Sequence, residues 1–311
     1  MNDTRKSVAK PADESAIGRP AGQVGLPTRL LGVWAHPDDE AYLAAGLMSR
    51  VAAAGGAVTL VVLTDGELGF AEQDRRSRAE RSAQRRSEML DAMGVIGVTD
   101  VRFIGIGDGD VRAVPVAELA AGLSDTIRGA RPELITTFGP DGVTGHQDHV
   151  AASVATTRAW LETDIGDLWY AAKTTRWLDD WRSIHDDLGI WMTAEPSGYE
   201  PGDLAAVVRL SEDELNTKRR VLAGHCSQTE GVARVFGESA YREWICEESF
   251  RRPTDNEMLA IDPTASVASR CHRSGRGVWN DAQPSDHAVV VAPDGCTKYR
   301  ESIAPQREFS R

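Results

Sequence analysis

The sequence predicts an α/β fold in which a mostly parallel sheet is covered by helices on both faces. From Arg29 onward, short apolar runs alternate with longer amphipathic stretches, as in successive strand–helix–strand units. Motifs rich in histidine, aspartate and glycine follow several of the apolar runs. Because ligands of parallel sheets bind beyond the carboxyl ends of the strands, we expect the active site at that edge.

The apolar runs define the predicted strands. "LLGVWA" is typical of a buried strand, and "AVTLVVLTDGE" is a second strand that leads into a glycine-containing loop. Later runs are shorter, but each is bounded by turn residues or by an amphipathic stretch. The predicted strands cover residues 30–35, 57–67, 101–110, 133–140, 168–177 and 204–210.

The segments between these strands have helical periodicity. Leu43, Leu47 and Val51 recur every four residues, and Ser211 with Glu214 forms a capping box that predicts a later helix start. The helices expected in the first half cover residues 41–56, 72–93, 114–128 and the stretch after "GHQDH" to about residue 160. The alternation predicts a Rossmann-like arrangement.

Length and composition divide the chain and exclude some partners. We expect a flexible tail at residues 1–28, a catalytic domain at 29–252, and an accessory or poorly ordered extension at 253–311. A net charge of -12 argues against binding nucleic acid or anionic membranes. The first 28 residues lack the apolar segment of a secretory signal and no run is long enough to span a bilayer, so the expected location is cytoplasmic.

The first motif is "LGVWAHPDDEA" at residues 31–41. Pro37 and the three following carboxylates would suit the capped start of a helix, because acidic side chains stabilise the positive end of the helix dipole. His36 and Asp39, however, lie three residues apart directly after a buried strand, so one turn brings both to the same side. Taken alone, this motif is explained better by a capped helix start than by a metal site.

The second motif, "TGHQDHVAAS", repeats this arrangement after a later strand. His146, Asp148 and His149 enter a helix there, and two strand ends of one parallel sheet can converge on a single point. Two histidines and one carboxylate form a typical three-ligand catalytic zinc site with a fourth position for water. The pair of motifs therefore predicts a metal site that neither motif predicts alone.

"AHPDDE" and "GHQDHVAAS", with "LTDGELG" and "RRSE" between them, resemble the PIG-L or LmbE-like family of zinc-dependent N-deacetylases. The resemblance covers about residues 29–250. It implies a hydrolase that removes an N-acetyl group from an N-acetylglucosamine-containing or related amino-sugar substrate. A homo-oligomer is compatible with it.

The resemblance also implies roles for individual residues. It implies that His36, Asp39 and His149 bind Zn²⁺, with Fe²⁺ an alternative for the same ligand set. Asp38 matches the general base that takes a proton from zinc-bound water, and His146 matches the general acid that stabilises the oxyanion and protonates the leaving amine.

Residues around this centre have weaker signals. Arg85, which forms an RxxE segment with Glu88, and Asp108 match positions that bind sugar hydroxyls, although an exposed ion pair and a turn explain them equally well. Asp148 is expected either to hold His146 or to act from the second shell, and Glu40 is expected at the helix start or in a second-shell bond. The sequence does not settle whether His225 faces the pocket.

One departure affects the choice of substrate. The mycothiol-pathway deacetylases carry a tyrosine two residues before the histidine matched by His146, whereas this chain has Thr144. The resemblance therefore favours a general member of the family over the mycothiol step. An amidase acting on another small amide or thiol conjugate, or a non-catalytic protein that binds sugar or metal, remains an alternative.

Overall fold

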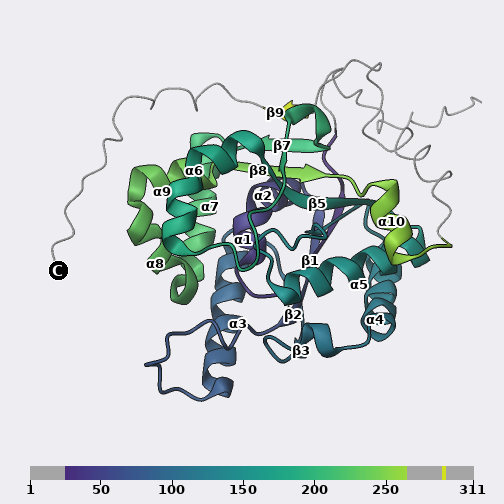
Figure 1. Cartoon of the computed structure of the whole chain (residues 1–311), viewed down its shortest axis with the longest axis horizontal. Helices are drawn as coiled ribbons and strands as arrows, with labels where there is room; N and C mark the ends of the chain where they lie inside the picture. The colour runs from purple at the N-terminus through teal and green to yellow at the C-terminus, as the bar shows by residue number, and fades with distance from the viewer. Residues whose placement is uncertain (1–24, 265–288, 292–311) are drawn as a thin grey trace, which may run out of the picture.

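The computed structural model describes residues 25–264 and 289–291 and contains one large mixed sheet (Figure 1). The predicted strands are all present, with ends shifted by a few residues. In chain order, the strands are β1 (Arg29–Trp34), β2 (Ala57–Thr64), β3 (Asp100–Ile106), β4 (Leu134–Phe138), β5 (Asp167–Thr174), β6 (Gly198–Tyr199), β7 (Ala206–Arg209), β8 (Glu247–Arg251) and β9 (Val289–Val291).

The sheet order is β3-β2-β1-β4-β5-β8-β7-β9, with β6 paired to β5. All pairings are parallel except those of β8, which runs antiparallel to both β5 and β7. The predicted mostly parallel α/β fold is therefore confirmed. The chain extends the sheet in one direction from β1 through β3 and in the other from β4, so β1 and β4 flank a topological switch point.

Helices cover both faces of the sheet. One group consists of α4, α5 and α10, in which α4 and α5 pack against β1 (Figure 1). The other group includes α1 and α2, which also contact β1, and α7, which packs on α2 and α3. The helices are α1 (Asp39–Leu43), α2 (Ala45–Ala53), α3 (Arg78–Gly94), α4 (Val116–Ala130), α5 (Gln147–Thr163), α6 (Thr175–Leu188), α7 (Glu212–Gly224), α8 (Cys226–Phe236), α9 (Glu238–Ile245) and α10 (Asp255–Ile261).

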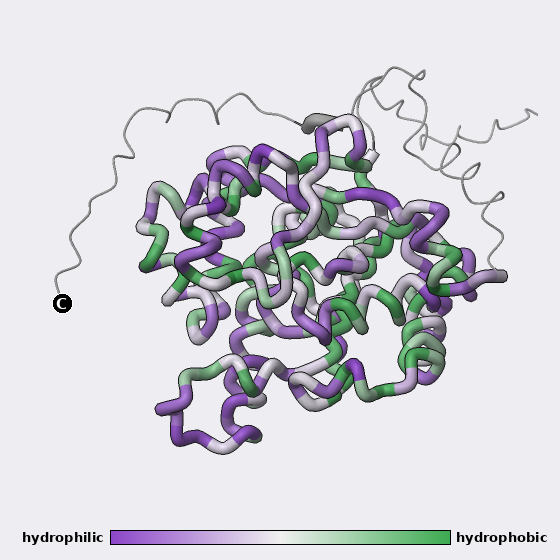
Figure 2. Tube along the Cα trace, viewed as in Figure 1, coloured by the Kyte–Doolittle hydropathy of each residue, from purple (hydrophilic) through white to green (hydrophobic). Residues whose placement is uncertain are grey.

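The central strands form the core. In β1, Leu31, Val33 and Trp34 are fully buried, and in β2 every residue after the first is buried. The tube in Figure 2 is accordingly green along the inner strands and purple mainly on the outer helices and loops. Burial on both faces explains why these strands are continuous apolar runs rather than alternating ones.

The single helix predicted over residues 41–56 is in fact two helices. The chain leaves helical geometry at Ala44, whose φ is -146°, and α2 starts at the next residue. The buried carboxylate of Glu248 accepts hydrogen bonds from the backbone N–H groups of Gly46 (2.7 Å) and Leu47 (2.9 Å). A side chain about 200 residues away therefore caps the second helix, which no local pattern could reveal.

The folded unit continues past the predicted boundary at residue 252. α10 begins with a Thr254–Glu257 capping box and buries Met258, and Glu257 forms an ion pair with Arg251 at 2.6 Å. Its position against α5 makes it part of the domain. Residues 1–24 of the expected tail, and most of the extension after residue 264, lie outside the described residues.

No helix within residues 25–264 and 289–291 is both long and apolar enough to cross a bilayer.

Candidate metal centre and active site

The loop between β1 and α1 carries the first motif in a strained conformation. Asp38 has φ 127° and ψ -26°, which a non-glycine residue rarely adopts. Hydrogen bonds fix this turn from both sides: Asp39 Oδ2 accepts the His36 N–H at 2.7 Å, and Glu40 Oε2 accepts the Asp38 N–H at 3.1 Å. The acidic residues therefore do begin a helix, and they also turn the loop toward the carboxyl end of β4.

The second motif enters the same space from the start of α5. His146 is the N-cap of α5, and His149 lies one turn further, stacked on Phe138 at the end of β4 with ring centroids 4.1 Å apart. His149 Nδ1 lies 2.9 Å from the Gly142 carbonyl oxygen and 3.2 Å from the Thr144 hydroxyl. These contacts orient the ring so that Nε2 faces the first motif.

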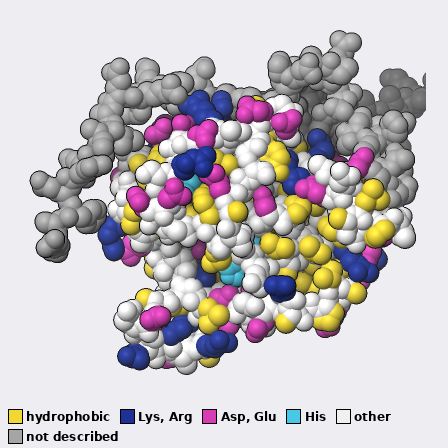
Figure 3. All heavy atoms as spheres, viewed as in Figure 1, with side chains coloured by type: hydrophobic (Ala, Val, Ile, Leu, Met, Phe, Trp, Pro, Cys, Tyr) yellow, Lys and Arg dark blue, Asp and Glu magenta, His cyan; other side chains and the backbone are white. Residues whose placement is uncertain are grey.

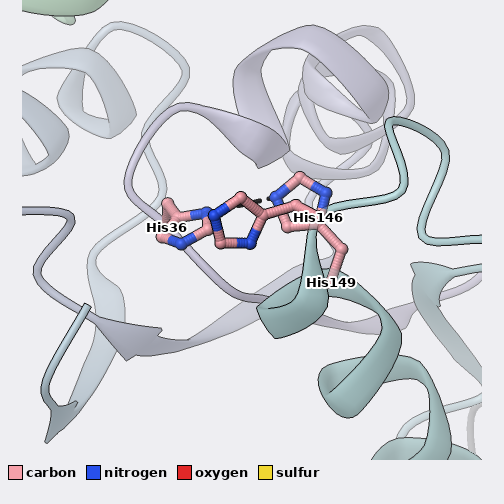
Figure 4. A group of neighbouring side chains, drawn as sticks. All are labelled: His36, His146 and His149. Carbon is pink, nitrogen blue, oxygen red and sulfur yellow. Dashed lines mark hydrogen bonds between the residues drawn. The ribbon is translucent and has the colours of Figure 1, made fainter. Parts of the chain in front are cut away.

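The side chains of three residues from the two motifs form a compact triangle, in which a different oxygen of Asp39 faces each histidine. His36 Nδ1 lies 3.1 Å from His149 Nε2 and 3.6 Å from Asp39 Oδ2, while His149 Nε2 lies 3.3 Å from Asp39 Oδ1. Tetrahedral zinc with bonds of 2.0–2.1 Å separates its ligand atoms by about 3.3 Å. The donor set and its spacing therefore fit a metal ion, and Figure 4 shows the two rings with the dashed contact between them.

The other nitrogen of His36 faces two buried carboxylates. His36 Nε2 lies 3.1 Å from Asp108 Oδ1 and 3.4 Å from Asp148 Oδ2. Burial opposes a charged imidazole, but these carboxylates and Asp39 raise the pKa of His36 well above its ordinary value. Such contacts fix which nitrogen carries the proton and leave Nδ1 for a metal.

Asp108 and Asp148 are therefore placed beneath His36. Asp148 also accepts the N–H groups of Gly109 (2.8 Å) and Val111 (3.2 Å), and Asp108 accepts the Leu68 N–H at 2.8 Å. Both side chains are buried. The hydrogen bond and ion pair of Asp108 join it to Leu68 and His36. Its expected contact with a sugar hydroxyl stays a prediction.

One expectation about His146 needs correction. The Asp148 carboxylate does not hold its ring; instead, the Asp148 backbone N–H donates to His146 Nδ1 at 3.1 Å, because the side chain is directed at His36. Burial and the neighbouring His36 lower the pKa of His146. Its ring centroid lies 4.6 Å from that of His36 and 5.0 Å from that of His149, so it stands beside the triangle (Figure 4).

Asp38 lies next to the triangle without being part of it. Burial raises the pKa of its carboxyl to about 6, although Arg85, with an Nη2 atom 3.2 Å from Asp38 Oδ1, opposes this shift. A carboxylate with a pKa near neutrality is well suited to accept a proton in catalysis.

Arg85 is not an exposed helix side chain. It is 3% exposed, donates to the Gly66 carbonyl oxygen at 2.7 Å and to that of Pro37, and so ties the loop after β2 to the turn of the first motif. Its partner in the RxxE segment, Glu88, instead accepts from Ser227 Oγ at 2.7 Å. The predicted sugar contact of Arg85 is untested by this geometry.

His225 has a structural position. Its Nε2 lies 2.8 Å from Glu40 Oε1, and both side chains are buried. Burial alone would lower the pKa of His225, but the Glu40 carboxylate raises it. Since Glu40 Oε2 also accepts the Asp38 N–H, the Glu40–His225 pair stabilises the strained turn at Asp38.

A cavity of about 260 Å³ opens beside Asp38, Asp39 and His149. Its far wall comes from β5, α6, α8 and α9, and Figure 3 shows histidine atoms near the middle of this face beside hydrophobic side chains. No motif in the sequence indicated the wall residues Lys173, Trp177, Trp191 and Trp244. The concentration of tryptophan in "LWYAAKTTRWLDDW" was a signal for Trp177 alone, and Trp191 and Trp244 lie outside that stretch.

Within the described ranges, two overlapping groups of side chains have ligand atoms that all lie within 4.8 Å of one another. They are His36 with His146 and His149, and His36 with Asp108 and Asp148. Both groups share His36, so they are the two alternatives against which a metal ion held by His36, Asp39 and His149 has to be tested.

Comparisons with known proteins identify the family. Residues 31–160, which contain both motifs, match the family model described as GlcNAc-PI de-N-acetylase, PIG-L. A 1D-myo-inositol 2-acetamido-2-deoxy-alpha-D-glucopyranoside deacetylase from Kineococcus radiotolerans is 33% identical over 67% of this chain and 66% of its own length. A protein of the same name from Acidothermus cellulolyticus is 38% identical over 47% of this chain and 58% of its own length.

Among solved structures, the N,N'-diacetylchitobiose deacetylase from Pyrococcus horikoshii superimposes with a TM-score of 0.52 at 19% identity, covering 78% of this chain and 89% of that one. This likeness concerns the fold. The chain spans less than two thirds of the length of these two curated relatives. The chain therefore belongs to the PIG-L (LmbE-like) deacetylase family, because it matches the family model and carries both motifs, one after β1 and one at the start of α5.

Proposed function

We propose that this chain is a metal-dependent hydrolase that removes the N-acetyl group from an N-acetylglucosamine-containing or related amino-sugar substrate. The observation that carries the proposal is the triangle of His36 Nδ1, Asp39 and His149 Nε2, with the non-ligand carboxylate of Asp38 beside it. A protein that only stored or sensed metal would not need Asp38. The names of the curated relatives support the same substrate class.

The triangle fits Zn²⁺, and Fe²⁺ tolerates the same ligands. Such a metal, when bound, polarises the amide carbonyl and lowers the pKa of coordinated water. His36, Asp39 and His149 would hold it. Burial lowers the pKa of His149 to about 4, which keeps its ring neutral and able to act as a ligand.

Asp38 takes the proton of the attacking water. Its carboxylate is held at the mouth of the cavity by Arg85, and its side chain remains about one-fifth exposed, so a water molecule can reach it. The Asp38 carboxylate pairs with Arg85, whereas the Asp39 carboxylate faces His36 and His149, so the two neighbouring residues serve different functions.

His146 donates the proton that allows the amine to leave. Because its Nδ1 accepts from the Asp148 backbone, Nε2 is the nitrogen available for substrate. The negative charges of Asp148, Asp39 and Asp108 favour its protonated form and partly offset burial. In the overall reaction, water adds across the C–N bond and yields a carboxylic acid and a free amine.

The test is acetate release from a panel of N-acetyl amino sugars after reconstitution with zinc, comparing the wild type with Asp38→Ala. We expect turnover by the wild type and a loss of about 10²-fold or more in kcat for Asp38→Ala, with metal content unchanged. The matched control is Asp125→Ala, which removes an exposed carboxylate on α4 and should act like the wild type.

Acetate release by Asp38→Ala at the wild-type rate would disprove the assigned base. Binding of metal without acetate release from any sugar would favour an amidase acting on another small amide or thiol conjugate, or a non-catalytic protein.

A further inference from the structure

The cavity beside the metal centre has an unusual wall for a protein that acts on a sugar. It reaches Asp38, Asp39 and His149, but neither Arg85 nor Asp108, the residues expected to contact sugar hydroxyls, lines it. Five aromatic side chains do, and we call this space the aromatic cavity: Tyr42, Phe138, Trp177, Trp191 and Trp244.

The polar atoms of two of these side chains are already bonded to the protein. Trp177 Nε1 donates to the Trp244 carbonyl oxygen at 2.9 Å, and Trp244 Nε1 donates to His185 Nε2 at 3.0 Å. What these residues offer to a ligand is therefore the apolar ring surface that neighbouring side chains leave uncovered. Lys173, Gln228 and Glu247 also line the cavity, but most of the wall is apolar, so a polyhydroxylated group would lose more hydrogen bonds to water than the wall can replace.

The aromatic cavity is held open by ring packing. Trp177 and Trp244 stack with centroids 5.8 Å apart, and Tyr42 meets Trp244 edge-on at 5.6 Å. These side chains come from α6, α9 and α1, so three elements brace the wall. Lys173 Nζ lies 4.3 Å from the centroid of the Trp177 ring, which directs the ammonium at an indole face.

The volume is too large for an acetyl group. A methyl group is about the size of a water molecule, which occupies about 30 Å³ in the liquid, whereas an apolar cavity of about 150 Å³ is enough to bind benzene. The aromatic cavity measures about 260 Å³. Thr144, a small residue beside His149, contributes to its lining next to the metal centre.

An amide has two substituents, and the cavity can take only one of them. The sugar amine needs hydrogen-bond partners, while the acyl chain needs none. We infer that the aromatic cavity binds the acyl group of the substrate, and that this enzyme accepts and prefers an aromatic or branched apolar acyl group larger than acetyl. The inference rests on the proposed amide hydrolysis and adds the class of acyl group to it.

The first test compares N-phenylacetylglucosamine with N-acetylglucosamine as substrates of the zinc-reconstituted full chain. Burial of a phenyl ring against the cavity wall should raise kcat/KM for the phenylacetyl compound by about tenfold or more over the acetyl compound. Equal values, or a preference for acetyl, would overturn the inference while leaving the proposed deacetylation intact.

The second test fills the cavity. Val232 on α8 lines it, and Val235 on the same helix is 60% exposed. Val232→Trp should lower the ratio of kcat/KM for phenylacetyl over acetyl by about tenfold, and the matched Val235→Trp should leave that ratio unchanged. If Val232→Trp does not fold, Ile190→Trp fills the cavity from the loop after α6 and should lower the same ratio. An unaltered ratio in the folded variant would contradict the assignment.

A binding measurement separates the two proposals. By isothermal titration calorimetry without added metal, N-phenylacetylglucosamine should bind the wild type and Val235→Trp at least about tenfold more tightly than Val232→Trp. Such binding without turnover of any N-acyl sugar would reject the proposed hydrolysis and keep the cavity assignment. The absence of both binding and turnover would reject both.

Discussion

At Asp38, one residue combines a positive φ with a partly buried carboxyl whose pKa is raised to about 6. Glu40 and Arg85 stabilise this strained backbone conformation. Glu40 accepts the Asp38 N–H, and Arg85 donates to the Pro37 carbonyl oxygen and forms an ion pair with the Asp38 carboxylate. Residues held in sparsely populated backbone regions are common at active sites, where their surroundings stabilise them. The carboxylate that performs the chemistry is thus positioned mainly by residues that bind no metal.

His185 is a buried histidine whose ionisation should control stability. Burial lowers its pKa from 6.5 to about 4, and its Nε2 accepts the Trp244 indole N–H. Because the unfolded chain binds this proton more readily between pH 4 and 6.5, folding stability is full above pH 6.5 and falls as the pH drops, by up to about 3 kcal/mol.

The measurement is the free energy of unfolding in urea between pH 7 and 5. His185→Gln keeps an acceptor for Trp244 but cannot ionise, so it should lose less stability over this range than the wild type. Parallel pH profiles for the two proteins would show that His185 does not contribute.

The residues of the site differ in how well the sequence indicated them. His36, Asp39, His146 and His149 were predicted together because each pair follows a strand in a recognisable motif, and the structure brings them together. The sequence indicated that Asp148 supports the site, but not that its side chain contacts His36. The direction of its side chain depends on the Gly109 and Val111 N–H groups, which belong to another loop and leave no signal in the second motif.

At the scale of elements, local patterns were sufficient where an element is specified by its own sequence. The capping box of α7 and the apolar runs of β1 and β2 are examples. The start of α3 was predicted at residue 72, whereas the helix begins at Arg78 after a Ser77–Glu80 capping box. The division between α1 and α2 could not be predicted, because Glu248 in β8 caps the second helix. The antiparallel β8 was also missed, since its sequence, Glu-Glu-Ser-Phe-Arg, has few apolar residues even though it is buried.

The junction of α2, α7 and β8 depends on one buried ion pair. Lys218 Nζ lies 2.7 Å from Glu248 Oε1 and also donates to the Tyr42 carbonyl oxygen, and the side chains of Lys218 and Glu248 are fully buried. Lys218→Met should lower the free energy of unfolding by about 3–5 kcal/mol, because it leaves the carboxylate without its counter-charge.

The double variant Lys218→Met with Glu248→Gln is the control, because it removes the stranded charge and should recover part of the loss in urea denaturation. A loss below about 1 kcal/mol for Lys218→Met alone would show that the pair is not needed to join these elements.

At the scale of the whole molecule, the topology of the sheet explains where the site lies. β1 and β4 are neighbours although the order of strands reverses between them, so loops separated by 113 residues in sequence bring His36 and His149 into contact. This convergence was predictable from two motifs at parallel strand ends. The aromatic cavity was not, because its wall comes from the less regular second half of the domain.

The position of the metal ion is the most direct test of the central claim. Crystals grown with zinc and measured at its absorption edge should show one anomalous peak within about 2.0–2.2 Å of His36 Nδ1, His149 Nε2 and an Asp39 oxygen, with Asp38 outside the ligand sphere. A peak bonded to His146, or one on the other side of His36 between Asp108 and Asp148, would contradict it.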